Sequence, residues 1–424
     1  MTEEGAVTGT TRRVSRGLLP RILAVACAML LVGCVPGVDR RIVEGAVEEW
    51  EAPAFYELPD PIPAGSPGDI YRSERLTSTM DGTIAWRILY HSTDLNGENI
   101  LVSGTVVAPT TAAPSGTAPS GTAPSSGRPV VAWAHPTTGT APRCAPSAGL
   151  DPFDLIEGLR GLIEQGYVVA STDYPGLGAD GPDSYLVGVT EGNSVLDAAR
   201  AARSIPETGA GDELLLWGHS QGGQAALFAA QSVAQYAPEL TLKAVAVAAP
   251  ATDLGQLLDD DLDDISGVTI SSYALTAYSE VYPQAALDTI LTPAGVKATP
   301  GMNALCLLGQ NRAIHTIARP LIGEYFSGDP TQVEPWATLL TENSPGAVAL
   351  TVPLFIAQGE TDTLVDPKTT SAFADHECSI GTRVTYVPLP KTGHGLAALR
   401  ALDTLMPWFA QVQRGETVTS TCAE

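Results

Sequence analysis

A Gly-x-Ser-x-Gly pentapeptide at residues 218–222 constrains this chain more than any other feature. It follows a short apolar run that predicts a buried strand, and an alanine-rich run that predicts a helix comes next. A turn between such a strand and helix leaves no room for a Cβ atom two positions before or after the serine. The pattern is typical of a nucleophile elbow, which holds a serine hydroxyl clear of the sheet, and here it comprises Ser220 with Gly218, His219 and Gly222. An incidental serine in a glycine-rich turn is the less favoured interpretation.

A serine hydroxyl needs a base to take its proton and a carboxylate to orient that base. In chains with this elbow, the acid and then the histidine follow the serine. His394 is the preferred base, because it lies in a glycine-containing loop between a predicted strand and the last predicted helix. His315 falls in a predicted cap and His376 on a predicted helix, and both are interpreted as solvated or structural.

The acid is expected just beyond the end of the buried run at 352–357. Asp362 is preferred, and Glu360 and Asp366 are the alternatives. The interval from Asp362 to His394 leaves room for one helix and one strand, as an alternating α/β chain requires.

Two backbone N–H groups are needed to stabilise the negative charge on a tetrahedral intermediate. The N–H of Gln221, directly after the serine, is expected to be one donor. The other should come from the loop after an earlier strand, where Pro136 has no N–H to offer. Thr137 or Thr138 is therefore expected to donate, and His135 is interpreted as a residue that orders this loop.

The N-terminus indicates export. Four arginines precede an apolar stretch at 22–32, which is too short to span a bilayer but fits a signal peptide. Leu31, Val32, Gly33 and Cys34 then match a bacterial lipobox, so residues 1–33 are predicted to be removed and Cys34 to be lipidated. Ordinary secretion with a cut nearby is the alternative.

Composition agrees with an extracytoplasmic protein. Four cysteines remain beyond the leader and the lipobox: Cys144, Cys306, Cys378 and Cys422. Outside the cytoplasm, four thiols indicate two disulfides, and three ways of pairing them are open. The formal net charge of −24 disfavours nucleic acid and anionic membranes as partners, so membrane contact is expected only through the lipid anchor. No cofactor or metal is expected, the oligomeric state is not predicted, and the acidic run at 259–264 is interpreted as a solvated helix face.

Strands alternate with helical patterns after position 129, which predicts an α/β fold with a mostly parallel sheet covered on both faces. Between 251 and 350 the alternation stops, and an inserted helical cap is expected, with helices near 255–264, 273–282, 284–291 and 304–317. The core is predicted in two parts, 69–250 and 351–424, after a tether or wrapping segment at 34–68 and interrupted by a disordered repeat at 109–128. Strands are expected near 70–76, 83–92, 99–108, 129–135, 167–173, 213–218, 242–248, 353–358 and 383–387.

Several motifs together resemble the secretory lipase family, which has many actinobacterial members, over about residues 70–412: Gly-His-Ser-Gln-Gly-Gly at 218–223, Cys-Ala-Pro-Ser at 144–147, Asp-Tyr-Pro-Gly-Leu-Gly at 173–178 and Gly-x-x-Asp at 359–362. The resemblance implies an α/β-hydrolase core with a cap, hydrolysis of carboxylic esters, and a Ser220, Asp362 and His394 triad. It also favours pairing Cys144 with Cys306 and Cys378 with Cys422. This chain has threonines in the oxyanion loop, where the best-known yeast member of the family uses an aspartate.

The expected activity is acyl transfer from an ester or lipid substrate to water through an acyl-enzyme. A serine peptidase on the same fold and an acyltransferase of envelope lipids would use the same residues. A non-catalytic surface-binding lipoprotein is the alternative from another class, and an intact set of catalytic residues argues against it.

Overall fold

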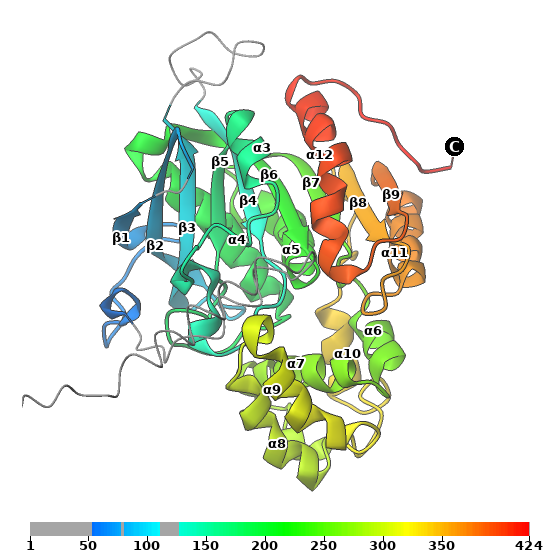
Figure 1. Cartoon of the computed structure of the whole chain (residues 1–424). Coiled ribbons are helices and arrows are strands. Elements are labelled where there is room, and N and C mark those ends of the chain that lie inside the picture. The colour runs from blue at the N-terminus through cyan, green and yellow to red at the C-terminus, as the bar shows by residue number, and fades with distance from the viewer. Residues whose placement is uncertain (1–52, 78–79, 111–126, 424) are drawn as a thin grey trace, which may run out of the picture.

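The computed structural model describes residues 53–77, 80–110 and 127–423 (Figure 1). The predicted signal peptide, Cys34, nearly all of the repeat at 109–128 and half of the predicted tether lie outside these residues. The described part of that tether, residues 53–68, includes a short turn of 3-10 helix, η1 (Ala54–Tyr56), packed by Phe55 and Tyr56 against β2 and β3.

A nine-stranded sheet forms the centre of the described chain, in the order β1-β2-β3-β5-β4-β6-β7-β8-β9. The first three strands and the β3–β5 contact are antiparallel, and every pairing from β5 to β9 is parallel. Each predicted strand coincides with one of these, so the mostly parallel sheet is confirmed. The strands are β1 (Ile70–Leu76), β2 (Thr83–Thr93), β3 (Asn99–Pro109), β4 (Arg128–Ala134), β5 (Val168–Thr172), β6 (Ala210–His219), β7 (Thr241–Ala248), β8 (Leu354–Gly359) and β9 (Val384–Leu389).

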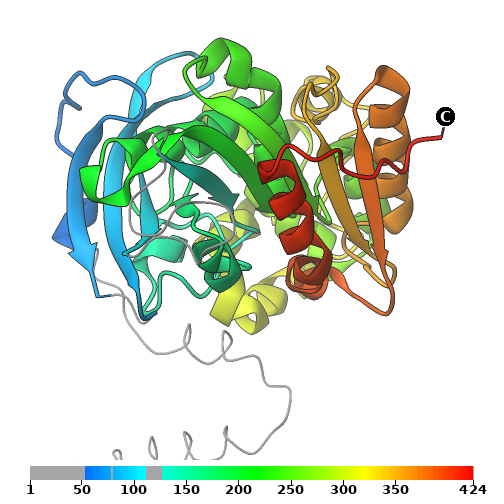
Figure 2. The same cartoon turned by 90° about the horizontal axis from the view of Figure 1, so that it is seen from above.

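Helices cover both faces of the sheet, as Figure 2 shows from above. One hydrophobic cluster joins the sheet to α4 (Gly188–Arg203), α5 (Gln221–Tyr236) and α11 (Pro367–Ile380). A second cluster, on the opposite face, joins it to α3 (Leu159–Glu164) and α12 (Ala397–Gln413). Because both faces are covered, the central strands carry continuous apolar runs, and all residues of β5 and β8 are buried.

A layer of helices lies between β7 and β8 in the sequence and below the sheet in Figure 1. It has its own hydrophobic cluster, which includes Tyr273, Tyr278, Met302 and Trp336. This is the inserted cap that the sequence predicts. Its helices are α6 (Leu254–Asp261), α7 (Ile265–Val281), α8 (Pro293–Asn303), α9 (Leu307–Ala318) and α10 (Trp336–Glu342).

The cap differs from the prediction in its details. The helix expected at 284–291 is only a 3-10 turn, η5 (Leu287–Thr289), because Pro293 disfavours helical backbone at the residue before it and begins the next helix, α8. Helix α8 was not predicted, since it contains Pro300 and two glycines, and α10 was also missed. Among the described residues, no helix combines the length and apolar character needed to cross a bilayer.

Candidate active site

The elbow is formed by Ser220, the single residue between β6 and α5. Its backbone has φ 58° and ψ −119°, a strained conformation for a residue with a side chain. A Cβ on Gly218 would overlap the backbone of Gly222, and a Cβ on Gly222 would overlap that of Ala134. The glycines are therefore required by the close approach of α5 to the strand ends, as the pentapeptide predicts.

The structure brings together Ser220 and the two residues that the sequence singles out after it. The Oγ of Ser220 lies 2.8 Å from Nε2 of His394, and Nδ1 of His394 lies 2.9 Å from Oδ2 of Asp362. With Nδ1 protonated, His394 donates to the carboxylate and accepts the serine hydroxyl proton. The three side chains thus form one continuous chain of hydrogen bonds, contributed by the ends of β6, β8 and β9.

Asp362 is held as an acceptor on both oxygens. Oδ1 accepts from the backbone N–H groups of Leu364 and Val365, at 2.9 and 3.0 Å, while Gln358 donates to Oδ2 at 3.1 Å. Burial alone would raise the pKa of Asp362, but the hydrogen bond from His394 and the backbone donors outweigh it and leave the pKa below its usual value. The carboxylate is therefore ionised at neutral pH.

The alternative residues lie elsewhere. Glu360 is exposed, and the side chain of Asp366 caps α11 by accepting from the backbone N–H of Lys368 at 2.7 Å. His376 faces the carbonyl of Gly346 at 2.9 Å, in keeping with a structural role. His315 lies on α9 in the cap, as predicted, and it lines the same pocket as Ser220.

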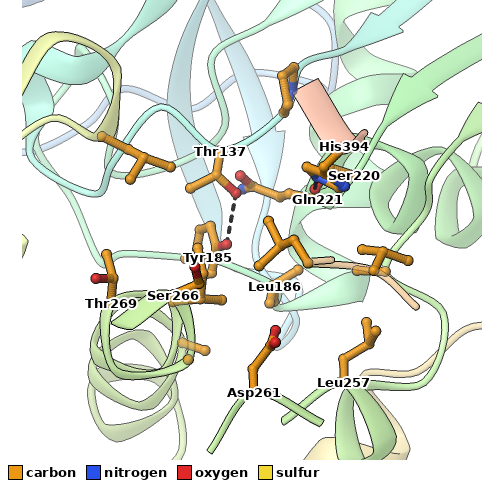
Figure 3. A pocket seen from close by; sticks show the side chains of 18 of the residues that line it. Thr137, Tyr185, Leu186, Ser220, Gln221, Leu257, Asp261, Ser266, Thr269 and His394 are labelled. Carbon is orange, nitrogen blue, oxygen red and sulfur yellow. Dashed lines mark hydrogen bonds between the residues drawn. The ribbon is translucent and has the colours of Figure 1, made fainter. Parts of the chain in front are cut away.

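The two threonines of the predicted oxyanion loop have different surroundings. Thr137 lines the pocket beside Ser220 and Gln221, and its hydroxyl pairs with that of Tyr185 at 2.8 Å (Figure 3). Thr138 faces away, and its carbonyl accepts from the N–H of Leu307 in the cap at 2.8 Å. Of the two, only Thr137 is among the residues that line the pocket.

A buried glutamate that no sequence motif indicates supports this side of the site. Oε1 of Glu191, in the first turn of α4, accepts from Nε2 of Gln221 at 2.6 Å and from the N–H of Leu186 at 3.0 Å. Burial raises the pKa of Glu191 well above its usual value, which disfavours a negative charge at this position. Its partners lie 30 and 5 positions away in the chain, which no local motif reveals.

His135 agrees with the role of ordering the loop. It is fully buried, its Nδ1 donates to the carbonyl of Pro136 at 2.7 Å, and its Nε2 lies 3.2 Å from the carbonyl of Asp173. Burial lowers the pKa of His135, which keeps the ring neutral. Its carbonyl accepts from the hydroxyl of Tyr174 at 3.0 Å, so the loop is fixed to the segment after β5.

A cavity of about 560 Å³ separates Ser220 and His394 from the cap. Its walls are mainly apolar and are built from α6, α7 and the start of α9. The apolar side chains are those of Leu254, Leu257, Leu258, Ile270, Leu275, Leu307 and Leu308, and α7 adds the polar side chains of Ser266, Thr269 and Ser271. Such a pocket accepts an alkyl chain. Within the part of the chain that the structure describes, no group of histidine, cysteine and acidic side chains could hold a metal ion.

One residue of the acidic run corrects the sequence interpretation. Asp259, Asp260 and Asp263 are exposed, as expected of a solvated face, but Asp261 is only 7% exposed and lines the pocket. Its spacing from Leu254, Leu257 and Leu258 is that of the apolar face of α6. The helix ends at Asp261, so the helical face assumed for the whole run does not continue.

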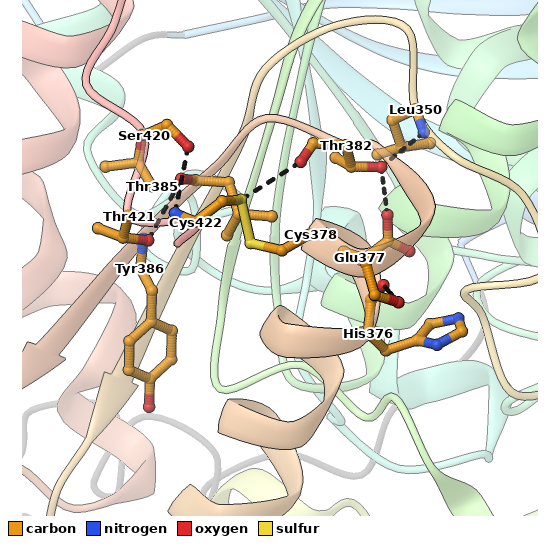
Figure 4. Close-up of a disulfide and its surroundings, with 12 residues drawn as sticks. Leu350, His376, Glu377, Cys378, Thr382, Thr385, Tyr386, Ser420, Thr421 and Cys422 are labelled. Carbon is orange, nitrogen blue, oxygen red and sulfur yellow. Dashed lines mark hydrogen bonds between the residues drawn. A yellow bond between two sulfur atoms is a disulfide. The ribbon is translucent and has the colours of Figure 1, made fainter. Parts of the chain in front are cut away.

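Two disulfides link distant parts of the chain, Cys144 to Cys306 and Cys378 to Cys422, in the pairing that the family resemblance implies. The first joins the segment after the oxyanion loop to the start of α9 in the cap. The second joins α11 to the C-terminal segment (Figure 4). That segment also pairs with β9, because the N–H of Thr421 donates to the carbonyl of Val384 at 2.7 Å.

The fold and the elbow define the class: the chain is an α/β hydrolase. The family model described as secretory lipase matches residues 155–421, more than half of the chain, so the chain belongs to the secretory lipase family and is a carboxylic ester hydrolase.

Relatives and a solved structure agree with this. A secreted triacylglycerol lipase of Malassezia globosa is 24% identical over 96% of this chain and 89% of its own. A protein of Mycobacterium tuberculosis named a probable inactive lipase is 24% identical over 78% of this chain and 75% of its own. The crystal structure of Candida antarctica lipase A in its closed state superposes with a TM-score of 0.73 at 18% identity, covering 87% of each chain, and supports the fold.

Proposed function

We propose that this protein hydrolyses carboxylic esters of lipids outside the cytoplasm, with Ser220 as nucleophile, His394 as base and Asp362 as the acid that orients the base. The continuous hydrogen-bond chain through these three side chains is the observation that carries the proposal. The geometry of Ser220 and His394 favours an active enzyme over a binding protein.

In the acylation step, Nε2 of His394 accepts the proton of Ser220 as Oγ attacks the ester carbonyl. The imidazolium that forms is stabilised by the ionised Asp362. His394 then gives the proton to the leaving alcohol. Water attacks the acyl-enzyme in the second half of the reaction, with His394 again acting as base, and releases the carboxylic acid.

The backbone N–H groups of Gln221 and Thr137 are proposed to stabilise the developing oxyanion. Gln221 is the first residue of α5, whose N-terminus carries a partial positive charge. Thr137 borders the same pocket as Ser220, whereas Thr138 does not. Glu191 holds the side chain of Gln221 in place, and it is proposed as a positioning residue rather than a catalytic one.

The apolar cavity supports an acyl chain as the part of the substrate bound under the cap. The Malassezia relative is named a triacylglycerol lipase, and acylglycerols are accordingly the proposed substrate class. An envelope-lipid acyltransferase would use the same groups but would exclude water from the second step. A serine peptidase is less favoured, because the walls contributed by α6 and α7 suit an alkyl chain.

For the location, we propose that the mature protein begins at Cys34 and is anchored by lipid at the cell envelope, although Cys34 lies outside the described residues. The sequence at 31–34 and two disulfides support an extracytoplasmic protein. A diacylated cysteine supplies two chains, which is enough for stable membrane anchoring.

The test is a series of p-nitrophenyl esters of increasing acyl length, together with an acylglycerol and a peptide substrate. The wild type should release p-nitrophenol and free fatty acid and leave the peptide intact, while Ser220→Ala should be inactive on every ester. Cleavage of the peptide would favour the peptidase. Formation of a new ester in place of free acid, when an alcohol is added in small amounts, would favour the acyltransferase.

A further inference from the structure

Among the described residues that line the pocket, Asp261 is the one whose carboxylate has no hydrogen-bond or ion-pair partner. It is the last residue of α6 and is 7% exposed. Figure 3 shows its carboxylate pointing from the cap into the pocket, toward Leu186 and the side on which Ser220 and His394 lie. No hydrogen bond or ion pair to this carboxylate is present in the described structure.

Its surroundings disfavour a negative charge. Burial, and then the nearby charges of Asp264, Asp260 and Asp362, raise the pKa of Asp261 to about 7. The C-terminal end of α6 adds a partial negative charge at the same point. Arg312 and His315 of α9 line the same pocket, but neither forms an ion pair with Asp261 in the described part of the chain.

An apolar side chain would fit this position better if the pocket took only an alkyl chain. Asp261 follows the leucine face of α6 at helical spacing, where leucine occupies the three earlier pocket positions. An isolated buried carboxyl group costs free energy unless a hydrogen bond compensates for it. In the pocket that bond can come from water, or from a polar group of a bound substrate that displaces the water.

The geometry points to a substrate whose acyl chain carries a hydroxyl group, and Asp261 is the residue that recognises it. This inference rests on the proposed ester hydrolysis and names the acyl class. We assign the hydroxyl to the acyl part because Leu254, Leu257 and Leu258 line the pocket on the same helix as Asp261, and an alkyl chain packs against such side chains better than a small polar alcohol does.

A hydroxyl group fits better than a cation. A carboxyl group that changes its protonation near neutral pH still bonds to a hydroxyl, which donates to the ionised form and accepts from the neutral form. An ammonium group would pair only with the ionised form. The hydroxyl is therefore the partner that matches both states of Asp261.

The test compares pairs of p-nitrophenyl esters with the same chain length, one unsubstituted and one with a hydroxyl group, the hydroxyl being moved along the chain through the series. The ratio of kcat/KM within each pair is measured for the wild type, Asp261→Asn and Asp261→Leu. Asp260→Asn is the matched control, because it removes the same charge from an exposed position on the same helix. Each ratio is internal to one enzyme, so partial loss of folded protein does not affect it.

For at least one hydroxyl position, the wild type should prefer the hydroxylated ester about tenfold, the scale of one hydrogen bond to a charged or polar partner. Asp261→Asn, which still donates and accepts, and Asp260→Asn should keep most of this preference. Asp261→Leu should lose this preference, and its kcat/KM on the unsubstituted ester should rise.

Equal ratios in the wild type and Asp261→Leu at every hydroxyl position would overturn the inference and leave the ester hydrolase proposal standing. A preference for a chain with an ammonium group over one with a hydroxyl would overturn the assignment of the hydroxyl. If no ester of either kind is cleaved by any of the four proteins, the proposed function fails, and this inference fails with it.

Discussion

Replacing Asp362 with asparagine should reverse the tautomer of His394. The oxygen of the asparagine side chain must take the Oδ1 position, because the N–H groups of Leu364 and Val365 both donate there, at 2.9 and 3.0 Å. The NH₂ group then occupies the Oδ2 position, 2.9 Å from Nδ1 of His394. Two donors cannot face each other, so Nδ1 loses its proton and Nε2 gains one.

With Nε2 protonated, His394 cannot accept the proton of Ser220, and the acylation step loses its base. The corresponding change in serine proteases lowers kcat by about 10⁴, equivalent to about 5 kcal/mol of barrier. The assay is steady-state hydrolysis of a p-nitrophenyl ester, with thermal unfolding to show that the variant is folded.

The two other acids near β8 serve as matched controls. Glu360→Gln alters an exposed side chain, and Asp366→Asn retains a side-chain oxygen to cap α11, so both should keep activity within a few-fold of the wild type. Near-normal activity of Asp362→Asn, or the large loss at Glu360 or Asp366 instead, would refute the assignment of the acid.

Three further outcomes follow from the structure and sequence. Cys34→Ala should release the protein from the envelope with its esterase activity retained, and an intact-mass spectrum showing an unmodified N-terminus at another residue would contradict this. Replacing Cys144 and Cys306 by serine opens a loop of 162 positions and should lower the free energy of unfolding in urea by up to about 4 to 5 kcal/mol. The looser pocket should also raise KM. An unchanged midpoint of urea unfolding would refute the predicted stabilisation by this disulfide. Because burial raises the pKa of Asp261 to about 7, its contribution to stability is present near pH 4 and is lost as the pH rises toward about 7. Asp261→Asn should therefore raise the melting temperature at pH 8 but not at pH 4. An equal effect at both pH values would argue against a buried carboxylate.

The sequence was sufficient for those parts of the molecule that depend on local sterics and periodicity. The elbow could be predicted because a residue with a side chain at position 218 or 222 would overlap the neighbouring backbone. The buried strands could be predicted because both faces of the sheet are covered, which gives each central strand a continuous apolar run. The order of Ser220, Asp362 and His394 follows from the alternation of strands and helices, since each lies just past the end of a strand.

The structure of the cap and of the residues around the site depends on contacts between residues that are far apart in the sequence, which local sequence patterns do not reveal. Glu191 is buried and holds Gln221 only because α4 and α5 pack side by side. The sequence predicts a solvated helix face for the whole acidic run at 259–264, including Asp261, whereas α6 ends at Asp261. The helical spacing from Leu254 through Leu258 to Asp261 was the signal that could have placed it in the pocket.

Covalent labelling with a fluorophosphonate tests most directly whether Ser220 is an activated nucleophile. The wild-type protein should be labelled stoichiometrically at Ser220, as located by peptide mapping, and should lose esterase activity in proportion to the labelling. Ser220→Ala should remain unlabelled, and Asp362→Asn should react far more slowly. A folded wild-type protein that hydrolyses esters but is labelled at another residue, or that does not react with the probe at all, would contradict the central claim.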